Sequence, residues 1–338
     1  MEPKKEDSTN ISRKKFLRIC GSVIAGGAIV GVSGKLLYNK YGNQEVERKA
    51  QAVPQGSKSP YRLLSSIEVP EWIDGFELSG DKVIVAAANG IYVYDRSGNL
   101  SQNFAVASKV RDIAVKDETI YLLFPARIEA YNMEGDLVRD WKACDDHADY
   151  CSFAIAGDNL FVTDAGNKAI FKYGTDGSFV SVISSPNDFI IPSYSFGITA
   201  SNDRIYCSNP GRHQVESYTL DGQYKGAFGK AGGAAGMFCG CCNPVHLTHT
   251  SNGEIITSEK GNPRISCYSS DGKFRSVLLD SKALGGGNVA YNVRLDDDKV
   301  IVSGKNRISF FQYDGALAEG TDCSLCGLEC PLRKNVTI

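Results

Sequence analysis

Residues 82–87, Lys-Val-Ile-Val-Ala-Ala, are followed after Ala88-Asn89 by residues 90–95, Gly-Ile-Tyr-Val-Tyr-Asp. Both segments are rich in β-branched and aromatic residues, which favour strands, and a polar turn separates them. The stretch therefore predicts two strands joined by a tight turn.

The same pattern occurs six times between residues 61 and 318, and a turn glycine closes each copy. Five further strand pairs begin at Thr119 and Ile128, Asn159 and Ala169, Arg204 and Val215, Glu254 and Ile265, and Lys299 and Ile308. The closing glycines are Gly98, Gly135, Gly177, Gly222, Gly272 and Gly315. Repeats of about 40 residues made only of strands indicate propeller blades, because one such sheet cannot bury both faces without neighbours. We predict an all-β, six-bladed propeller over residues 61–318.

One copy carries a resemblance to a known repeat. It runs from residues 228–238, Phe-Gly-Lys-Ala-Gly-Gly-Ala-Ala-Gly-Met-Phe, through Asn243-Pro-Val-His-Leu to residues 259–265, Glu-Lys-Gly-Asn-Pro-Arg-Ile. This phrase resembles the NHL repeat, which implies an NHL-like propeller. The resemblance does not choose a function, because NHL propellers include protein-binding platforms, nucleic-acid binders and a zinc lyase.

The N-terminal residues have the layout of an export signal. Residues 12–18 read Ser-Arg-Lys-Lys-Phe-Leu-Arg, and an uncharged run follows from Ile19 to Gly34. The basic stretch resembles a twin-arginine signal but has Lys14 where that family has a second Arg, so ordinary secretion stays an alternative. As a helix the run would span about 24 Å, a marginal anchor for a hydrocarbon core of about 30 Å. We expect residues 1–38 to be an export signal or membrane anchor and residues 39–60 a linker.

The basic residues before the apolar run also predict the compartment. They place the N-terminus in the cytoplasm and the rest of the chain outside, in the periplasm. The 338 residues carry a net charge of −2 and 42% hydrophobic residues, which exclude a disordered or polybasic chain. Nucleic acid is therefore not an expected partner.

Eleven cysteines require an oxidising compartment or a metal centre. Eight of them are expected on one propeller face, in connections that follow the outer strand of a blade: Cys144, Cys151, Cys239, Cys241, Cys242, Cys323, Cys326 and Cys330. The last three belong to a predicted Cys-rich tail, residues 319–338. Cys207 and Cys267 lie within predicted strands and are expected to pack in the core.

Three chemistries stay open for these eight cysteines. Disulfides would tether the tail to the propeller and restrict the unfolded chain. An iron–sulfur centre is the second, because Cys323-x2-Cys326-x3-Cys330-Pro331 resembles the end of the bacterial ferredoxin motif. One Cys of that motif is absent, so a fourth ligand would come from Cys239, Cys241, Cys242 or elsewhere on the face. Zinc is the third. Adjacent Cys241 and Cys242 are expected to find separate partners, because a trans peptide holds their side chains apart.

A second candidate site is the mouth of the central channel. Four residues occupy corresponding positions at the start of the innermost strands: Asp112, Ser152, His246 and Asn292. His249, three residues after His246, is expected on the opposite side of its strand. The resemblance to NHL lyases implies a metal-supported site at this mouth, although the several inward-facing histidines that such a site needs are missing. No catalytic motif is present in the sequence.

These observations predict an exported, membrane-tethered propeller that acts as a binding platform for another envelope protein. Its functional surface would be the cysteine-rich face, stapled by disulfides. The alternative is a redox or electron-transfer protein that carries an iron–sulfur or zinc centre on that face.

Overall fold

The computed structural model describes residues 59–201 and 203–314. The predicted export segment, nearly all of the linker and the Cys-rich tail lie outside the described residues. Within the described part of the chain, no helix is both long and apolar enough to cross a membrane.

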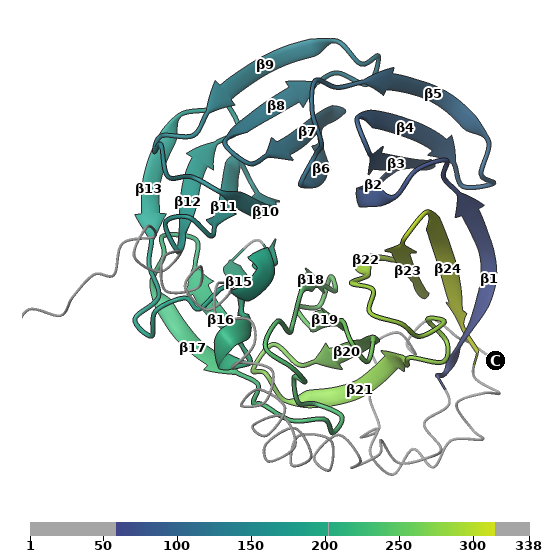
Figure 1. The fold of residues 1–338 in the computed structure, drawn as a ribbon, viewed down its shortest axis with the longest axis vertical. Coiled ribbons are helices and arrows are strands. Elements are labelled where there is room, and N and C mark those ends of the chain that lie inside the picture. The colour runs from purple at the N-terminus through teal and green to yellow at the C-terminus, as the bar shows by residue number, and fades with distance from the viewer. Residues whose placement is uncertain (1–58, 202, 315–338) are drawn as a thin grey trace, which may run out of the picture. The chain divides into compact units, whose positions relative to one another are not determined.

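The described residues form a β-propeller of six four-stranded sheets around a central axis (Figure 1). Blades one to three are β2 (Ile73–Ser79), β3 (Lys82–Ala87), β4 (Gly90–Asp95) and β5 (Leu100–Ala105); β6 (Asp112–Lys116), β7 (Thr119–Phe124), β8 (Arg127–Tyr131) and β9 (Leu137–Lys142); and β10 (Tyr150–Ala156), β11 (Asn159–Asp164), β12 (Ala169–Gly174) and β13 (Phe179–Ile183). Blades four and five are β14 (Ile198–Ala200), β15 (Arg204–Asn209), β16 (Gln214–Thr219) and β17 (Tyr224–Phe228); and β18 (His246–His249), β19 (Ile255–Glu259), β20 (Arg264–Tyr268) and β21 (Phe274–Leu279). The six-bladed architecture predicted from the repeats is confirmed.

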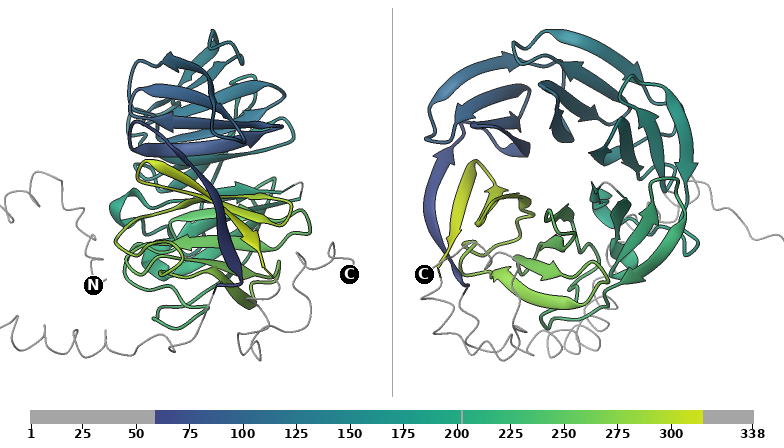
Figure 2. Two further views of the ribbon diagram at one scale, coloured as in Figure 1. Left: turned by 90° about the vertical axis from the view of Figure 1, so that its right-hand side faces the viewer. Right: turned by 180° about the vertical axis from the view of Figure 1, so that it is seen from behind.

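Blade six combines the two ends of the described chain. Strands β22 (Asn292–Asp296), β23 (Lys299–Gly304) and β24 (Arg307–Tyr313) are joined on the outside by β1 (Tyr61–Glu68). β1 pairs antiparallel with β24, and Figure 2 shows it crossing the outer edge of the ring. The ring is therefore closed by hydrogen bonds between its first and last strands.

This closure corrects which strand ends the described chain in blade six. The tail was expected to follow an outer strand, but the chain leaves blade six after β24, the third strand, because β1 already occupies the outer position. Asp314 N–H donates to the Pro60 carbonyl at 2.8 Å, at the end where β1 begins. The place of Cys323, Cys326 and Cys330 is outside the described residues.

The second strand of each blade explains the continuous apolar runs in the sequence. In β3, Ile84 and Ala86 pack toward blade two, whereas Val83, Val85 and Ala87 pack toward blade six. Successive side chains of a strand point to opposite faces, so a strand that is buried on both faces must be apolar throughout. The core is thus a ring of layers between neighbouring blades.

The connections between blades gather on one face, which we call the loop face. It carries residues 69–72, 106–111, 143–149, 184–197, 229–245 and 280–291. Several of these connections bond to the turn between the second and third strands of a blade. Val106 N–H donates to Asn89 O at 2.9 Å, and Ala143 N–H donates to Ala126 O at 2.9 Å.

Candidate functional site

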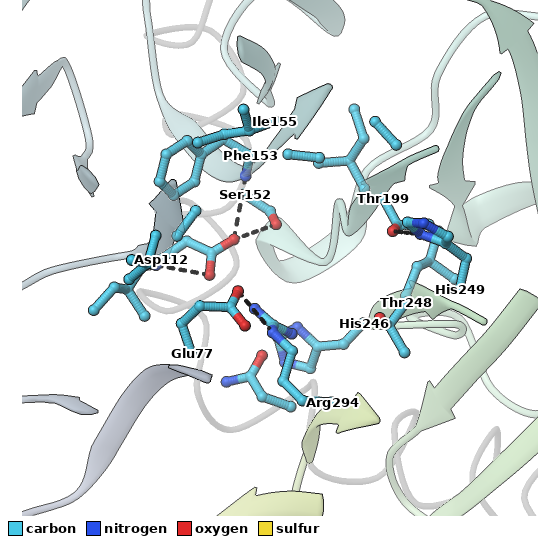
Figure 3. A pocket seen from close by; sticks show the side chains of 18 residues that line it. Glu77, Asp112, Ser152, Phe153, Ile155, Thr199, His246, Thr248, His249 and Arg294 are labelled. Atoms are coloured by element: carbon cyan, nitrogen blue, oxygen red, sulfur yellow. Dashed lines mark hydrogen bonds and ion pairs between the residues drawn. The ribbon is translucent and has the colours of Figure 1, made fainter. Parts of the chain in front are cut away.

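The first strands of the six blades line a cavity of about 220 Å³ on the propeller axis (Figure 3). The four predicted channel residues, Asp112, Ser152, His246 and Asn292, all lie in its wall. Each stands at or near the start of its strand, immediately after a loop-face connection. The structure thus brings these four residues together from blades two, three, five and six.

Asp112 is the most heavily bonded group in the wall. Its Oδ2 accepts hydrogen bonds from Ser152 Oγ at 2.5 Å and Phe153 N at 3.2 Å, and its Oδ1 accepts one from Ile113 N at 2.9 Å. Burial raises the pKa of Asp112, although the nearby Arg294 charge and these hydrogen bonds oppose that shift. The carboxylate is therefore held in place by its own blade and the next.

An ion pair that the sequence analysis missed lies in the wall of the same cavity, between neighbouring blades one and six. Arg294 Nε on β22 lies 3.0 Å from Glu77 Oε2 on β2, and the two side chains are 19% and 21% exposed. Arg294 also donates to the carbonyl of Val293 at 2.9 Å. The sequence did contain a signal for this pair. Glu77 and Arg294 are each a charged residue in the middle of a first strand, next to apolar residues.

Two histidines of β18 line the cavity. His249 was expected on the side opposite His246, and their neighbours agree with this: His249 Nδ1 is 2.8 Å from Thr199 Oγ1 on β14 of blade four, whereas the charge of Arg294 on β22 of blade six acts on His246. Leu247, two residues before His249, also packs toward blade four, as strand alternation requires. Burial, with Arg294 and Lys260 nearby, lowers the pKa of His246 to about 3, so its imidazole is neutral at pH 7. Burial also lowers the pKa of His249.

These groups equip the cavity to bind a small polar molecule. It offers a paired guanidinium, two carboxylates and neutral imidazoles, and its volume is about that of seven water molecules. Among residues 59–201 and 203–314, no group of three or more His, Cys, Asp or Glu could hold a metal ion.

The cysteines are divided between the loop face and the interior. Cys144, Cys239, Cys241 and Cys242 lie on loop-face connections, and Tyr173 OH donates to Cys144 Sγ at 3.4 Å. Cys151 was expected in a connection but is the second residue of β10, where it packs against the core and burial raises its pKa to about 12. Cys207 and Cys267 are buried in strands, as predicted.

Cys241 and Cys242 lie closer together than the sequence led us to expect. Their Sγ atoms are 3.2 Å apart, whereas separate partners were predicted for them. A trans peptide does not by itself fix χ1, so two adjacent side chains can turn toward each other at a suitable backbone bend. Among the described residues, no two cysteines are joined by a disulfide.

A chain of contacts crosses the loop face from blade two to blade five. Arg111 Nη2 lies 3.3 Å from Asp149 Oδ1, and its guanidinium lies 5.5 Å from the centre of the Tyr194 ring. Next to Tyr194, Ser193 Oγ accepts a hydrogen bond from Cys242 Sγ at 3.6 Å. We call these five residues the Tyr194 patch.

Comparisons with known proteins agree on the fold. The chain matches no protein-family model, and it matches no curated protein by sequence. Three similar solved structures are virginiamycin B lyase from Staphylococcus aureus (TM-score 0.53, 13% identity), a streptogramin B lyase (0.53, 15%) and a catalytically inactive His-to-Ala variant of the S. aureus enzyme with quinupristin (0.51, 14%). Each alignment covers 75% of this chain and 98–99% of the other. At this identity the likeness shows the six-bladed propeller fold alone.

Proposed function

We propose that this chain is a binding propeller, exported and tethered by its N-terminal segment, whose loop face docks another envelope protein through the Tyr194 patch. The observation that carries the proposal is the chain of contacts from Arg111 to Cys242. It joins side chains of four separate connections into one surface.

The chemistry of the patch suits protein recognition. The Tyr194 side chain is 56% exposed, and Ile190 on the same connection is 47% exposed. Tyr and Arg are enriched at the energetically important centres of protein interfaces. An exposed aromatic ring beside a guanidinium is therefore a suitable anchor for a partner.

The patch is also held on a rigid support. Phe189 and Phe196, which flank the Tyr194 turn, are almost completely buried, and their ring centres are 4.8 Å apart. A preformed surface loses little conformational entropy on binding. We therefore expect the Tyr194 patch to dock its partner without rearranging.

The remaining parts of the proposal rest on the sequence. The basic and apolar order of residues 12–34 supports export and a membrane tether, and the phrase in residues 228–265 supports the NHL resemblance. Disulfides from Cys144 or Cys239 of the loop face to the Cys-rich tail are part of the same proposal. The iron–sulfur or zinc alternative is supported by the spacing of Cys323, Cys326 and Cys330 alone.

The docking proposal is tested by site-specific photo-crosslinking of the full-length protein in its own cells. A photoreactive amino acid is placed at position 194, and a matched control is placed at position 179, because Phe179 is 51% exposed on outer strand β13. We expect a discrete protein adduct from position 194 only, and Arg111→Ala should weaken it severalfold. Equal adducts from both positions, or none from position 194, would contradict the proposal.

A further inference from the structure

We propose that Cys241 and Cys242 form a thiol–disulfide exchange site, which reduces a disulfide presented at the loop face and becomes a mutual disulfide. This activity goes beyond docking and needs no partner protein to be observed. The structure supports it by the approach of the two sulfurs, their accessibility and the support of their loop.

The two sulfurs are poised to bond. Their separation is 3.2 Å, and a disulfide bond is about 2.05 Å long, so an approach of about 1 Å completes the bond. Cys241 is exposed and Cys242 is half-buried, so an incoming disulfide can reach the pair from solvent. Access of this kind distinguishes a reactive thiol from a structural one.

Asn243 fixes the loop immediately after the pair. Its side chain is buried, accepts a hydrogen bond from Lys260 N at 2.9 Å, and donates to the carbonyls of Cys239 at 2.5 Å and Lys260 at 2.9 Å. One amide thus ties both sides of the cysteine pair to the turn between β19 and β20.

Arg264 fixes the part of the loop that precedes the pair. Its guanidinium forms a buried ion pair with Glu259, with Nε 2.5 Å from Oε1, and donates to the carbonyls of Gly233 and Met237. The adjacent Phe238 is fully buried. A loop that is anchored on both sides of the pair keeps the two thiols together instead of allowing them to diverge.

The two thiols titrate as a pair. The hydrogen bond and charge of Cys242 raise the pKa of Cys241, and the positive charge of Lys260 opposes that shift, so the two thiols lose their protons one after the other. Lys260 is held beside the pair, with Nζ donating to Ser195 Oγ at 3.4 Å. The first thiolate can then accept a hydrogen bond from the thiol that remains.

The exchange reaction balances in two displacements. The thiolate of one cysteine attacks a sulfur of the substrate R–S–S–R′, forms a mixed disulfide and releases R′–S⁻. The second cysteine loses its proton and attacks the first cysteine's sulfur, which releases R–S⁻ and forms the Cys241–Cys242 bond. Two electrons pass from the cysteine pair to the substrate disulfide, and the two cysteine protons end on the released thiolates.

The test uses full-length Cys239→Ser protein, so that residues 241 and 242 are the only thiols in tryptic peptide 231–260. The protein is reduced, freed of reductant, treated with the aromatic disulfide 5,5′-dithiobis(2-nitrobenzoate), quenched with N-ethylmaleimide and analysed by mass spectrometry. We expect the peptide to lack two hydrogens and to carry neither the aromatic thiol nor maleimide. Exposed Cys144, a single thiol on another connection, should keep the mixed disulfide and serves as an internal control.

Two further variants identify the resolving step. Adding Cys241→Ser or Cys242→Ser should leave a stable mixed disulfide on the remaining cysteine, because no second thiol is present to displace it. Phenylarsine oxide, which is captured by two thiols with loss of water, should protect the pair in Cys239→Ser protein and not in either double variant. Retention of two aromatic adducts on residues 241 and 242, or their linkage to other cysteines, would overturn the proposal.

Discussion

Ser152 Oγ donates a hydrogen bond of 2.5 Å to Asp112 Oδ2 and thereby joins the first strands of blades two and three at the propeller axis. The same carboxylate accepts the backbone N–H groups of Ile113 and Phe153. A single side chain therefore satisfies two buried backbone donors on neighbouring blades. Its removal should affect ring stability as well as the cavity.

Asp112→Ala should lower the free energy of unfolding by about 2–3 kcal/mol, because it leaves buried donors without an acceptor. Ser152→Ala removes one donor from a carboxylate that keeps its other bonds, and it should cost about 1 kcal/mol. Urea unfolding at pH 7 measures both values. Exposed Asp146→Ala is the control and should change stability by less than about 0.5 kcal/mol. Equal costs for Asp112→Ala and Asp146→Ala would contradict the assigned role.

The Glu77–Arg294 pair gives a second prediction, in the form of a double-mutant cycle. Arg294→Met leaves Glu77 without its cation in a mostly buried position, and we expect a loss of about 2–3 kcal/mol. Adding Glu77→Gln to this variant should recover about 1 kcal/mol or more, because the uncompensated charge is removed. Urea unfolding of the four proteins gives the coupling energy. Strict additivity of the two changes would show that the pair does not interact.

The fold was predictable from the sequence because each blade repeats the same local pattern. Val83 to Ala87 are apolar on both sides because a blade has two buried faces, and that pattern is visible without coordinates. The error concerned ring closure. The pairing of Tyr61 with Tyr313 is a contact between distant residues that no local pattern encodes.

Those cavity residues whose location follows from their position in the repeat were predictable from the sequence. Asp112 and His246 begin first strands, and every first strand must face the axis. Glu77 and Arg294 occupy corresponding positions, opposite the third residue of the second strand in their blades, but they become partners only through the closure of the ring, which residue order does not specify. The approach of Cys241 and Cys242 depends on side-chain rotamers, which residue order does not specify.

Gly197 provides a third prediction, at the contact between blades four and five. A Cβ atom at this position would lie 2.3 Å from the Val245 carbonyl oxygen, which is backbone and cannot turn aside. Gly197→Ala should therefore cost about 1–3 kcal/mol through overpacking. Gly233→Ala is the matched control, because its Cβ would meet no atom within 4 Å. Thermal unfolding that ranks the two variants equally would refute this account.

His246 provides the last prediction, which concerns pH. The pKa of His246 is lowered to about 3 in the folded protein by burial and by the charges of Arg294 and Lys260. An unfolded histidine titrates near 6.5, so between these values the unfolded chain binds more protons than the folded one. The stability that neutral His246 contributes is therefore complete above about pH 6.5 and is lost as the pH falls toward 3. Between pH 7 and pH 4.5 the loss should be about 2 kcal/mol, and His246→Gln should remove that part of the pH dependence.

His147→Gln is the control, because its side chain is 85% exposed and the variant should keep the wild-type dependence. Urea unfolding at the two pH values gives the comparison, and an unchanged difference in His246→Gln would show that His246 is not held neutral by the fold.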